Sequence, residues 1–313
     1  MSRAPQVRYL ADGRRLHLQD GPIDLVVQAY GRDSEVDAAY RAAVQQFTGL
    51  LDTLCDELPE LRRQANPDTT PLRGTVARRM HAAVAPFAAA HFITPMAAVA
   101  GAVAQEILGA MTAAAALDRA YVNNGGDIAL HLTSGTHFTV GLVDRPDLAA
   151  AGPIGTALIE PAHRARGVAT SGRHGRSFSL GIADAVTVLA ATAAEADAAA
   201  TMIANAVDLP GHPAVTRVPA CELQPDSDLG ARLVTQDVAV LSRVETNVAL
   251  DAGAAMADAL MARGLIEAAA LRLQGESRLV SRIERSLRVD RPHDVAPLAG
   301  IAGGASNVTR LCA

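Results

Sequence analysis

Alternating apolar and polar positions dominate the first thirty residues of the chain. Two extended segments between residues 7 and 30 are separated by Asp-Gly pairs, and residues 23–28 alternate as a half-buried strand does. Asp33 or Ser34 can then cap a helix predicted over about residues 33–58. The apolar positions of this helix recur every three or four residues and form one face: Val36, Tyr40, Val44, Phe47, Leu51 and Leu54.

The middle of the chain contains a second helical stretch, over about residues 73–90, and then a helix that is apolar nearly all round. Thr94 and Pro95 read as its N-cap and first residue, and it is predicted to run to about residue 117. Such a helix is buried, and its small side chains allow close backbone approach. Further strands are predicted at 138–143, 155–160, 167–169, 184–190, 233–241 and 266–273, and further helices at 195–207 and 245–263.

This order of elements predicts an α+β protein made of two halves, about 1–118 and 119–289, which together form a single domain. Each half is expected to pack helices on one face of a mainly antiparallel sheet. The tail over residues 290–313, which is rich in Gly and Ala, is expected to be mobile.

Composition narrows the classes of function. Of the 313 residues, 50% are hydrophobic and 19% are charged, which is enough apolar material for a folded core. The net charge of −5 argues against nucleic acid as a partner, because phosphate neutralisation normally requires a basic protein. All 28 basic residues are Arg, so the absence of Lys excludes Schiff-base chemistry and a P-loop lysine.

Cysteine usage and apolar run lengths bear on the compartment. The three cysteines are far apart and form no CxxC pair, which favours a reduced cytoplasmic setting over a disulfide framework. The first residues lack the apolar stretch of a signal peptide, and the longest apolar run near the middle, residues 96–104, is too short to span a bilayer. We therefore expect a cytoplasmic protein with no membrane partner.

Two glycine-containing segments carry candidate chemistry. Residues 123–127 (Asn-Asn-Gly-Gly-Asp) lie between apolar runs; they predict a hairpin turn whose glycines can bring backbone N–H groups close to a ligand. Residues 170–177 offer hydroxyls, two Arg and flexible backbone, which suit a phosphate or pyrophosphate. A plain hairpin and a solvated loop are the alternatives for these two segments.

Asp197 and Thr201 are four residues apart on a predicted helix, so a carboxylate and a hydroxyl share one face. By themselves they form a thin magnesium shell, which substrate phosphates and waters could complete. The alternative is an exposed helical Asp. The sequence contains no HExxH, GxSxG, Walker or EF-hand motif, and no catalytic residue is assigned.

Four segments in order resemble the ApbE superfamily, whose best-known members are FAD:protein FMN transferases. They are residues 122–128, residues 167–172, residues 186–188 and residues 196–201. The small-residue stretch 95–105 is similar to the glycine-containing helix of that family. The resemblance extends over about residues 7–280.

The resemblance implies a duplicated T-fold-like arrangement with a ligand cleft between the halves. It implies a Mg²⁺-dependent site for FAD or FMN, in which Asp197 and Thr201 hold the metal. The residues that would line the cleft are Asn124, Gly125, Gly126, Asp127, Thr170, Ser171, Gly172 and Arg173.

Three departures separate this chain from the transferases. Ala100 stands where they usually have Lys, Gln105 stands where they have Asp, and their His-x-x-Asp-Pro segment is missing or shortened after residue 177. Together with the expected cytoplasmic location, these departures suggest a cytoplasmic branch with an altered active site. Two alternatives stay open: an enzyme of another cofactor pathway with a pterin-type substrate, and a non-enzymatic ligand-binding module that assembles as a homo-oligomer through the 95–117 helix.

Overall fold

The computed structural model describes residues 4–142, 155–282, 287–289 and 310–312. Its largest element is a nine-stranded sheet in which every neighbouring pair is antiparallel. In spatial order the strands are β1 (Gln6–Tyr9), β2 (Leu16–Asp20), β3 (Ile23–Tyr30), β4 (Arg119–Asn124), β5 (Asp127–Leu132), β8 (Gly167–Ser171), β9 (Ala185–Ala190), β12 (Ala268–Leu273) and β13 (Glu276–Ser281).

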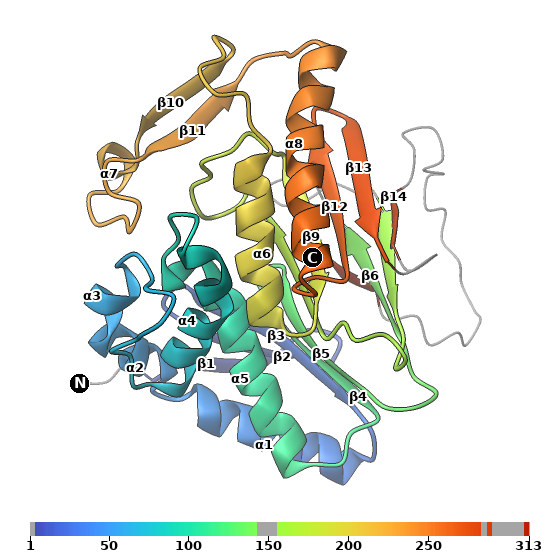
Figure 1. Cartoon of the computed structure of the whole chain (residues 1–313). Helices are drawn as coiled ribbons and strands as arrows, with labels where there is room; N and C mark the ends of the chain where they lie inside the picture. The colour runs from blue at the N-terminus through green and yellow to red at the C-terminus, as the bar shows by residue number, and fades with distance from the viewer. Residues whose placement is uncertain (1–3, 143–154, 283–286, 290–309, 313) are drawn as a thin grey trace.

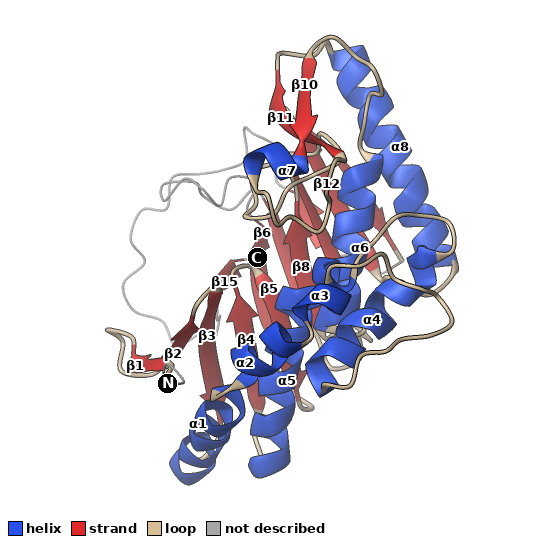
Figure 2. Ribbon diagram, turned by 90° about the vertical axis from the view of Figure 1, so that its left-hand side faces the viewer, coloured by secondary structure: helices blue, strands red, loops and turns tan. Residues whose placement is uncertain are grey.

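Helices cover one face of this sheet (Figures 1 and 2), which confirms the α+β class. The longer ones are α1 (Asp33–Phe47), α4 (Thr75–Ala88), α5 (Val99–Ala114), α6 (Ala193–Ala206) and α8 (Arg243–Ala262). The short ones are α2 (Leu50–Asp56), α3 (Leu58–Leu61), the 3₁₀ helix η1 (Pro95–Ala98) and α7 (Ala220–Leu223). The sheet faces them with one side of each strand, as the alternating burial along β3 shows.

The elements repeat once along the chain. Strands β2 and β3, then helices including α1 and α5, then β4 and β5 form the first unit; β8 and β9, then α6 and α8, then β12 and β13 form the second. The units join in the sheet where β5 pairs with β8. The division expected near residue 118 falls between α5 and β4, inside the first of these units.

A second sheet lies on the opposite face. Its strands, in order, are β14 (Leu287–Val289), β7 (Gly155–Ile159), β6 (Phe138–Leu142) and β15 (Arg310–Cys312). Phe138, Val140 and Ile159 pack there with Ile128 and Leu130 of β5. Of the tail expected to be mobile, residues 310–312 form β15, which runs parallel to β6; the rest lies outside the described residues.

An arm extends from the second unit at the top of Figure 1, made of β10 (Val215–Pro219), α7 and β11 (Leu233–Val238). Its strands pair only with each other among the described residues. At its base the backbone of Thr235 donates to Ser179 O at 2.8 Å, and its hydroxyl donates to Gly181 O at 2.8 Å. Neither β10 nor β13 was expected from the sequence, and the strand expected over 233–241 ends at Val238.

The helix expected over 33–58 is in fact interrupted. It ends at Phe47, and Gly49 adopts a φ of 77° before α2 begins at Leu50. This left-handed conformation costs other residues more than glycine, so the glycine marks the break. Leu50 and Leu54 of α2 are nevertheless buried in the core, as Phe47 is.

Helix α5 belongs to the core. With η1 it is long and apolar enough to cross a membrane, by length and composition alone, and among the described residues it is the one such helix. However, α5 contacts α1, α4 and α6, and its apolar residues join the central cluster: Ala102, Val103, Ala104, Ile107, Leu108 and Met111. Packing within this chain therefore accounts for these apolar residues, and an interface between copies through this helix stays a prediction.

Candidate functional site

A glycine turn joins β4 to β5 and has the predicted hairpin geometry. Gly125 and Gly126 have φ values of 65° and 112°, which glycine adopts at little cost. The side-chain oxygen of Asn123 accepts a hydrogen bond from Gly126 N–H at 2.8 Å. Asn124 is buried and donates to the carbonyl oxygen of Ala100 at 3.2 Å, so the turn is fixed to the first turn of α5.

Two carboxylates that are distant in the sequence meet beside this turn. Asp127 begins β5, and Asp197 lies in the second turn of α6. Asp197 accepts a hydrogen bond from Gly101 N–H at 3.0 Å, next to the residue that holds Asn124. Asp127 accepts one from Thr170 N–H at 3.2 Å. The tertiary structure thus gathers four segments at one place: the turn, α5, α6 and β8.

Burial changes the ionisation of both acids. It raises the pKa of Asp197 to about 7, against the opposing effect of the Gly101 and Ala100 N–H groups. Burial and then the charge of Asp197 raise the pKa of Asp127 well above its usual value, against the Thr170 N–H and the charge of Arg176. Both residues are half-buried. Two such adjacent carboxylates resist ionising together, and a bound divalent cation would remove that resistance.

This ionisation makes stability depend on pH. In the metal-free protein the fold binds protons at these carboxyls more tightly than the unfolded chain does. Their contribution to the free energy of unfolding therefore falls as pH rises from about 4 to about 7. Asp197→Asn removes one titrating group. In EDTA, the Tm of the variant minus the Tm of wild type should therefore increase as pH rises from about 4 to about 7. Thermal unfolding at several pH values measures this difference, and a pH-independent difference would contradict the expectation.

The predicted site residues at the end of β8 and just after it make different contacts. Thr170 supplies its N–H to Asp127, and its hydroxyl is 2.8 Å from the hydroxyl of Thr187. Gly172 is buried, and a Cβ there would overlap the backbone of Asp184. Ser171 is half-buried at the end of β8. This strand therefore places Thr170 at the carboxylate pair and directs the residues after Gly172 toward Asp184.

Arg173 is held by Asp184. Its Nε and one terminal nitrogen lie 2.9 and 2.8 Å from the same Asp184 oxygen, and His174 lies 3.3 Å from that oxygen. The other Asp184 oxygen accepts the Gln274 N–H at 2.5 Å. Both charged side chains are mostly buried, so this ion pair joins the loop to the β12–β13 turn.

Asp184→Ala is expected to lower the free energy of unfolding by about 3 kcal/mol, because it leaves a largely buried guanidinium without its partner. Denaturant unfolding measures the loss. Asp251→Ala is the matched control, because it removes a more exposed ion pair, to Arg278, and should cost less than about 1 kcal/mol. Equal losses in the two variants would show that the Asp184 contacts stabilise the fold no more than the exposed Asp251 ion pair does.

Arg176 is the charged residue that sequence reasoning did not single out. It is exposed, and its guanidinium lies against Gly125, so that a Cβ at this glycine would overlap it. Its charge also acts on Asp127. The signal available in the sequence was its place in the 170–177 loop, but which of the two loop arginines reaches the turn depends on the fold.

The candidate metal ligands are this pair of carboxylates and the hydroxyl of Thr201. Thr201 follows Asp197 by one turn of α6 and is half-buried. The described residues contain no group of three or more His, Cys, Asp or Glu side chains that could hold a metal ion. Two carboxylates and a hydroxyl suit Mg²⁺, which keeps several waters and substrate phosphate oxygens among its ligands.

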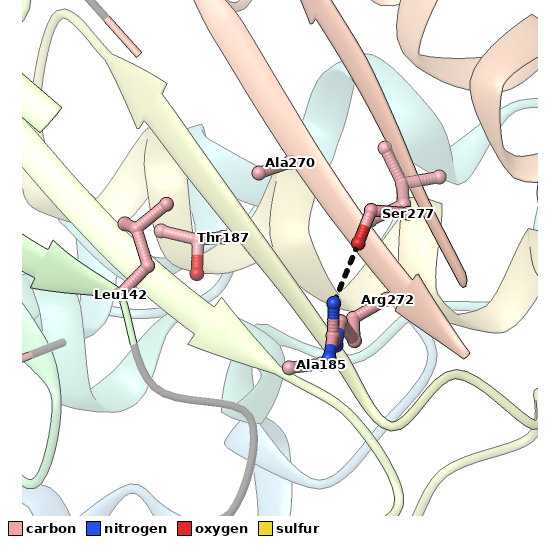
Figure 3. Close-up of a pocket in the computed structure, with 7 residues that line it drawn as sticks. Leu142, Ala185, Thr187, Ala270, Arg272 and Ser277 are labelled. Atoms are coloured by element: carbon pink, nitrogen blue, oxygen red, sulfur yellow. Dashed lines mark hydrogen bonds between the residues drawn. The ribbon is translucent and has the colours of Figure 1, made fainter. Parts of the chain in front are cut away.

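A separate hollow lies between the two sheets (Figure 3). Leu142, Thr187, Ala270 and Arg272 are among its lining residues, and Arg272 donates to the Ser277 hydroxyl at 3.0 Å. Its volume is about 10 Å³, which is room for one water molecule at most. This hollow is too small for a flavin or a nucleotide.

The fold and the site define a duplicated α+β protein with a half-buried acidic pair beside a glycine turn. The family model described as AbpE bacteria matches residues 7–279, so the protein belongs to this family. The chain is also 37% identical to a UPF0280 protein of Methanopyrus kandleri over 185 residues, which cover 58% of this chain and 69% of that relative. This similarity places the chain in the UPF0280 family as well.

Other relatives match shorter segments. A UPF0280 protein of Methanothrix thermoacetophila is 43% identical over 118 residues, 37% of this chain and 46% of that protein. One of Methanothermobacter thermautotrophicus is 41% identical over 123 residues, 38% of this chain and 44% of that protein. The chain thus matches less than half the length of these two relatives.

Proposed function

We propose that this protein binds a phosphate-bearing flavin or nucleotide together with Mg²⁺, and that the site lies at the Asp127–Asp197 pair. The observation that carries the proposal is the convergence of two half-buried, mutually repelling carboxylates on a glycine turn and the first turn of α5. An arrangement that raises the pKa of both acids weakens the apo fold, and such perturbed acids cluster at functional sites.

The donor set fits Mg²⁺. Asp127 and Asp197 would supply carboxylate oxygens, and Thr201 is a further oxygen donor one turn along α6. When bound, the cation supplies charge neutralisation at the ligand phosphates. The chain's own residues orient the site: Asn124 fixes the turn on α5, and the N–H groups of Gly101 and Thr170 hold the two carboxylates in place.

The resemblance to FAD:protein FMN transferases makes a Mg²⁺-dependent flavin transferase the specific reading of this proposal. In that reading a target hydroxyl attacks a phosphorus of FAD and AMP leaves. The departures from the transferases at Ala100 and Gln105 affect this flavin-transferase reading, because both residues lie on α5, which forms part of the site. The Gln105 side-chain oxygen is buried and has no hydrogen-bond partner among the described residues. A pterin-type substrate is the second candidate, favoured by this altered helix.

Purified protein is expected to bind FAD with a dependence on Mg²⁺. Incubation with FAD, with and without Mg²⁺, followed by desalting and absorbance spectroscopy measures the bound flavin. A thermal-shift series with FAD, FMN, AMP and a pterin separates the two ligand classes. Absence of bound flavin at high micromolar FAD would overturn the flavin version, and a shift with the pterin alone would support the second candidate.

A further inference from the structure

The loop after β8 brings one guanidinium to the glycine turn. Arg176 lies over Gly125, where the missing Cβ leaves the space that the guanidinium fills. Gly125 also has a φ of 65°, so a side chain there would be both strained and in collision. The side chain is exposed and, in the described part of the chain, its hydrogen bond reaches Pro22 O at a long 3.5 Å. Its position is therefore set by the turn rather than by a strong partner.

The other loop arginine cannot take this place. Arg173 is tied to Asp184 by two short contacts and is mostly buried. Lysine is absent from the whole chain. Arg176 is accordingly the loop arginine that lies against the glycine turn, and its charge acts on Asp127.

We propose that Arg176 binds a phosphate oxygen of the ligand above the Gly125–Gly126 turn; this inference rests on the proposed function. Without a cation, the guanidinium is attracted by Asp127. A divalent cation held by the two carboxylates would offset their charge, so that Arg176 would no longer be drawn to Asp127 and its guanidinium would be available to an anion at the turn. A guanidinium presents parallel N–H donors that match phosphate oxygens. The ligand class is a phosphate or pyrophosphate ester.

The test compares ligands that differ in phosphate. Titration calorimetry with Mg²⁺ uses FAD, riboflavin and inorganic pyrophosphate on wild type, Arg176→Gln and Arg32→Gln. Arg32 is the control because it is exposed and lies away from the glycine turn. It follows the end of β3 that pairs with Arg119, at the start of β4, whereas the glycine turn follows the end of β4. Arg176→Gln should weaken FAD and pyrophosphate binding about tenfold or more and riboflavin binding less than about twofold. Arg32→Gln should change none of them.

The outcomes separate the two proposals. If wild type binds FAD and Arg176→Gln binds it equally well, the role of Arg176 is wrong and the proposed function stands. If wild type binds pyrophosphate in an Arg176-dependent way but not FAD, the flavin assignment is wrong and the phosphate role of Arg176 stands. If wild type binds neither, both are overturned. Equal losses for FAD and riboflavin would show a structural effect of the variant and also overturn the inference. Because Arg176 is exposed, the variant should keep the Tm of wild type.

Discussion

Asp197→Asn is expected to weaken Mg²⁺-dependent FAD binding about tenfold or more, and the Asp127→Asn/Asp197→Asn double variant about a hundredfold. Each substitution removes a charged donor while keeping the size of the side chain. The same changes should raise the Tm of the metal-free protein above about pH 7, because they relieve two half-buried charges that repel each other. Opposite effects on binding and on stability are typical of a functional site.

The matched control is Asp258→Asn, which changes an exposed carboxylate on α8 and should alter neither quantity. Calorimetric titration with and without Mg²⁺ measures affinity, and thermal unfolding in EDTA measures stability. Unchanged affinity in both acid variants would remove the case for a magnesium site here. Lower apo stability in both variants would show that the carboxylates serve the fold instead.

Gly101→Ala is expected to lower the free energy of unfolding by about 2–3 kcal/mol, although alanine is the better helix former. A Cβ at Gly101 would overlap the backbone of Ala193 and Ala194, where α5 crosses α6. Neither helix can move away easily, because both pack on the sheet and on each other. The same backbone contact holds Gly101 N–H against Asp197, so the variant should also weaken Mg²⁺-dependent FAD binding.

Gly109→Ala provides the control on the same helix. Gly109 is exposed, and a Cβ there meets no atom within 4 Å. This variant should therefore gain about 0.5–1 kcal/mol from helix propensity. Denaturant unfolding of both variants separates the cost of a Cβ at the close approach of α5 and α6 from the gain in helix propensity. A stabilising effect of Gly101→Ala would refute the tight crossing. If wild type is an oligomer and Gly101→Ala is a folded monomer, the interface hypothesis for this helix would be supported.

Much of the fold could be predicted from local patterns. The alternation in β3, the apolar helix after Pro95 and the turn at Gly125–Gly126 are encoded by periodicity and by residues with special backbone preferences. The break at Gly49 was missed, because the apolar face of the predicted helix continues through it. Strands β10 and β13 were missed as well. The pattern of β13 is weak because it lies at the sheet edge and only Val280 of its residues is buried.

For the site, the sequence and the resemblance named Asp127, Thr170 and Asp197, and the structure brings these three together. Their binding of a ligand, and that of Asn124, Ser171 and Thr201, stays a prediction. Sequence reasoning named Arg173 but not Arg176. Both arginines occupy the same loop, and nothing local distinguishes them. The fold decides between them, because it places Asp184 against Arg173.

The sequence by itself determined the α+β class, the glycine hairpin and the small-residue helix, because each depends on neighbours a few positions away. The tertiary structure decided what those elements meet. The charge on Asp127 depends on Asp197, which reaches it through the crossing of α5 and α6 at Gly101 and Ala193. Burial and Coulomb repulsion act between groups that are close in space, so a raised pKa cannot be predicted from spacing along the chain.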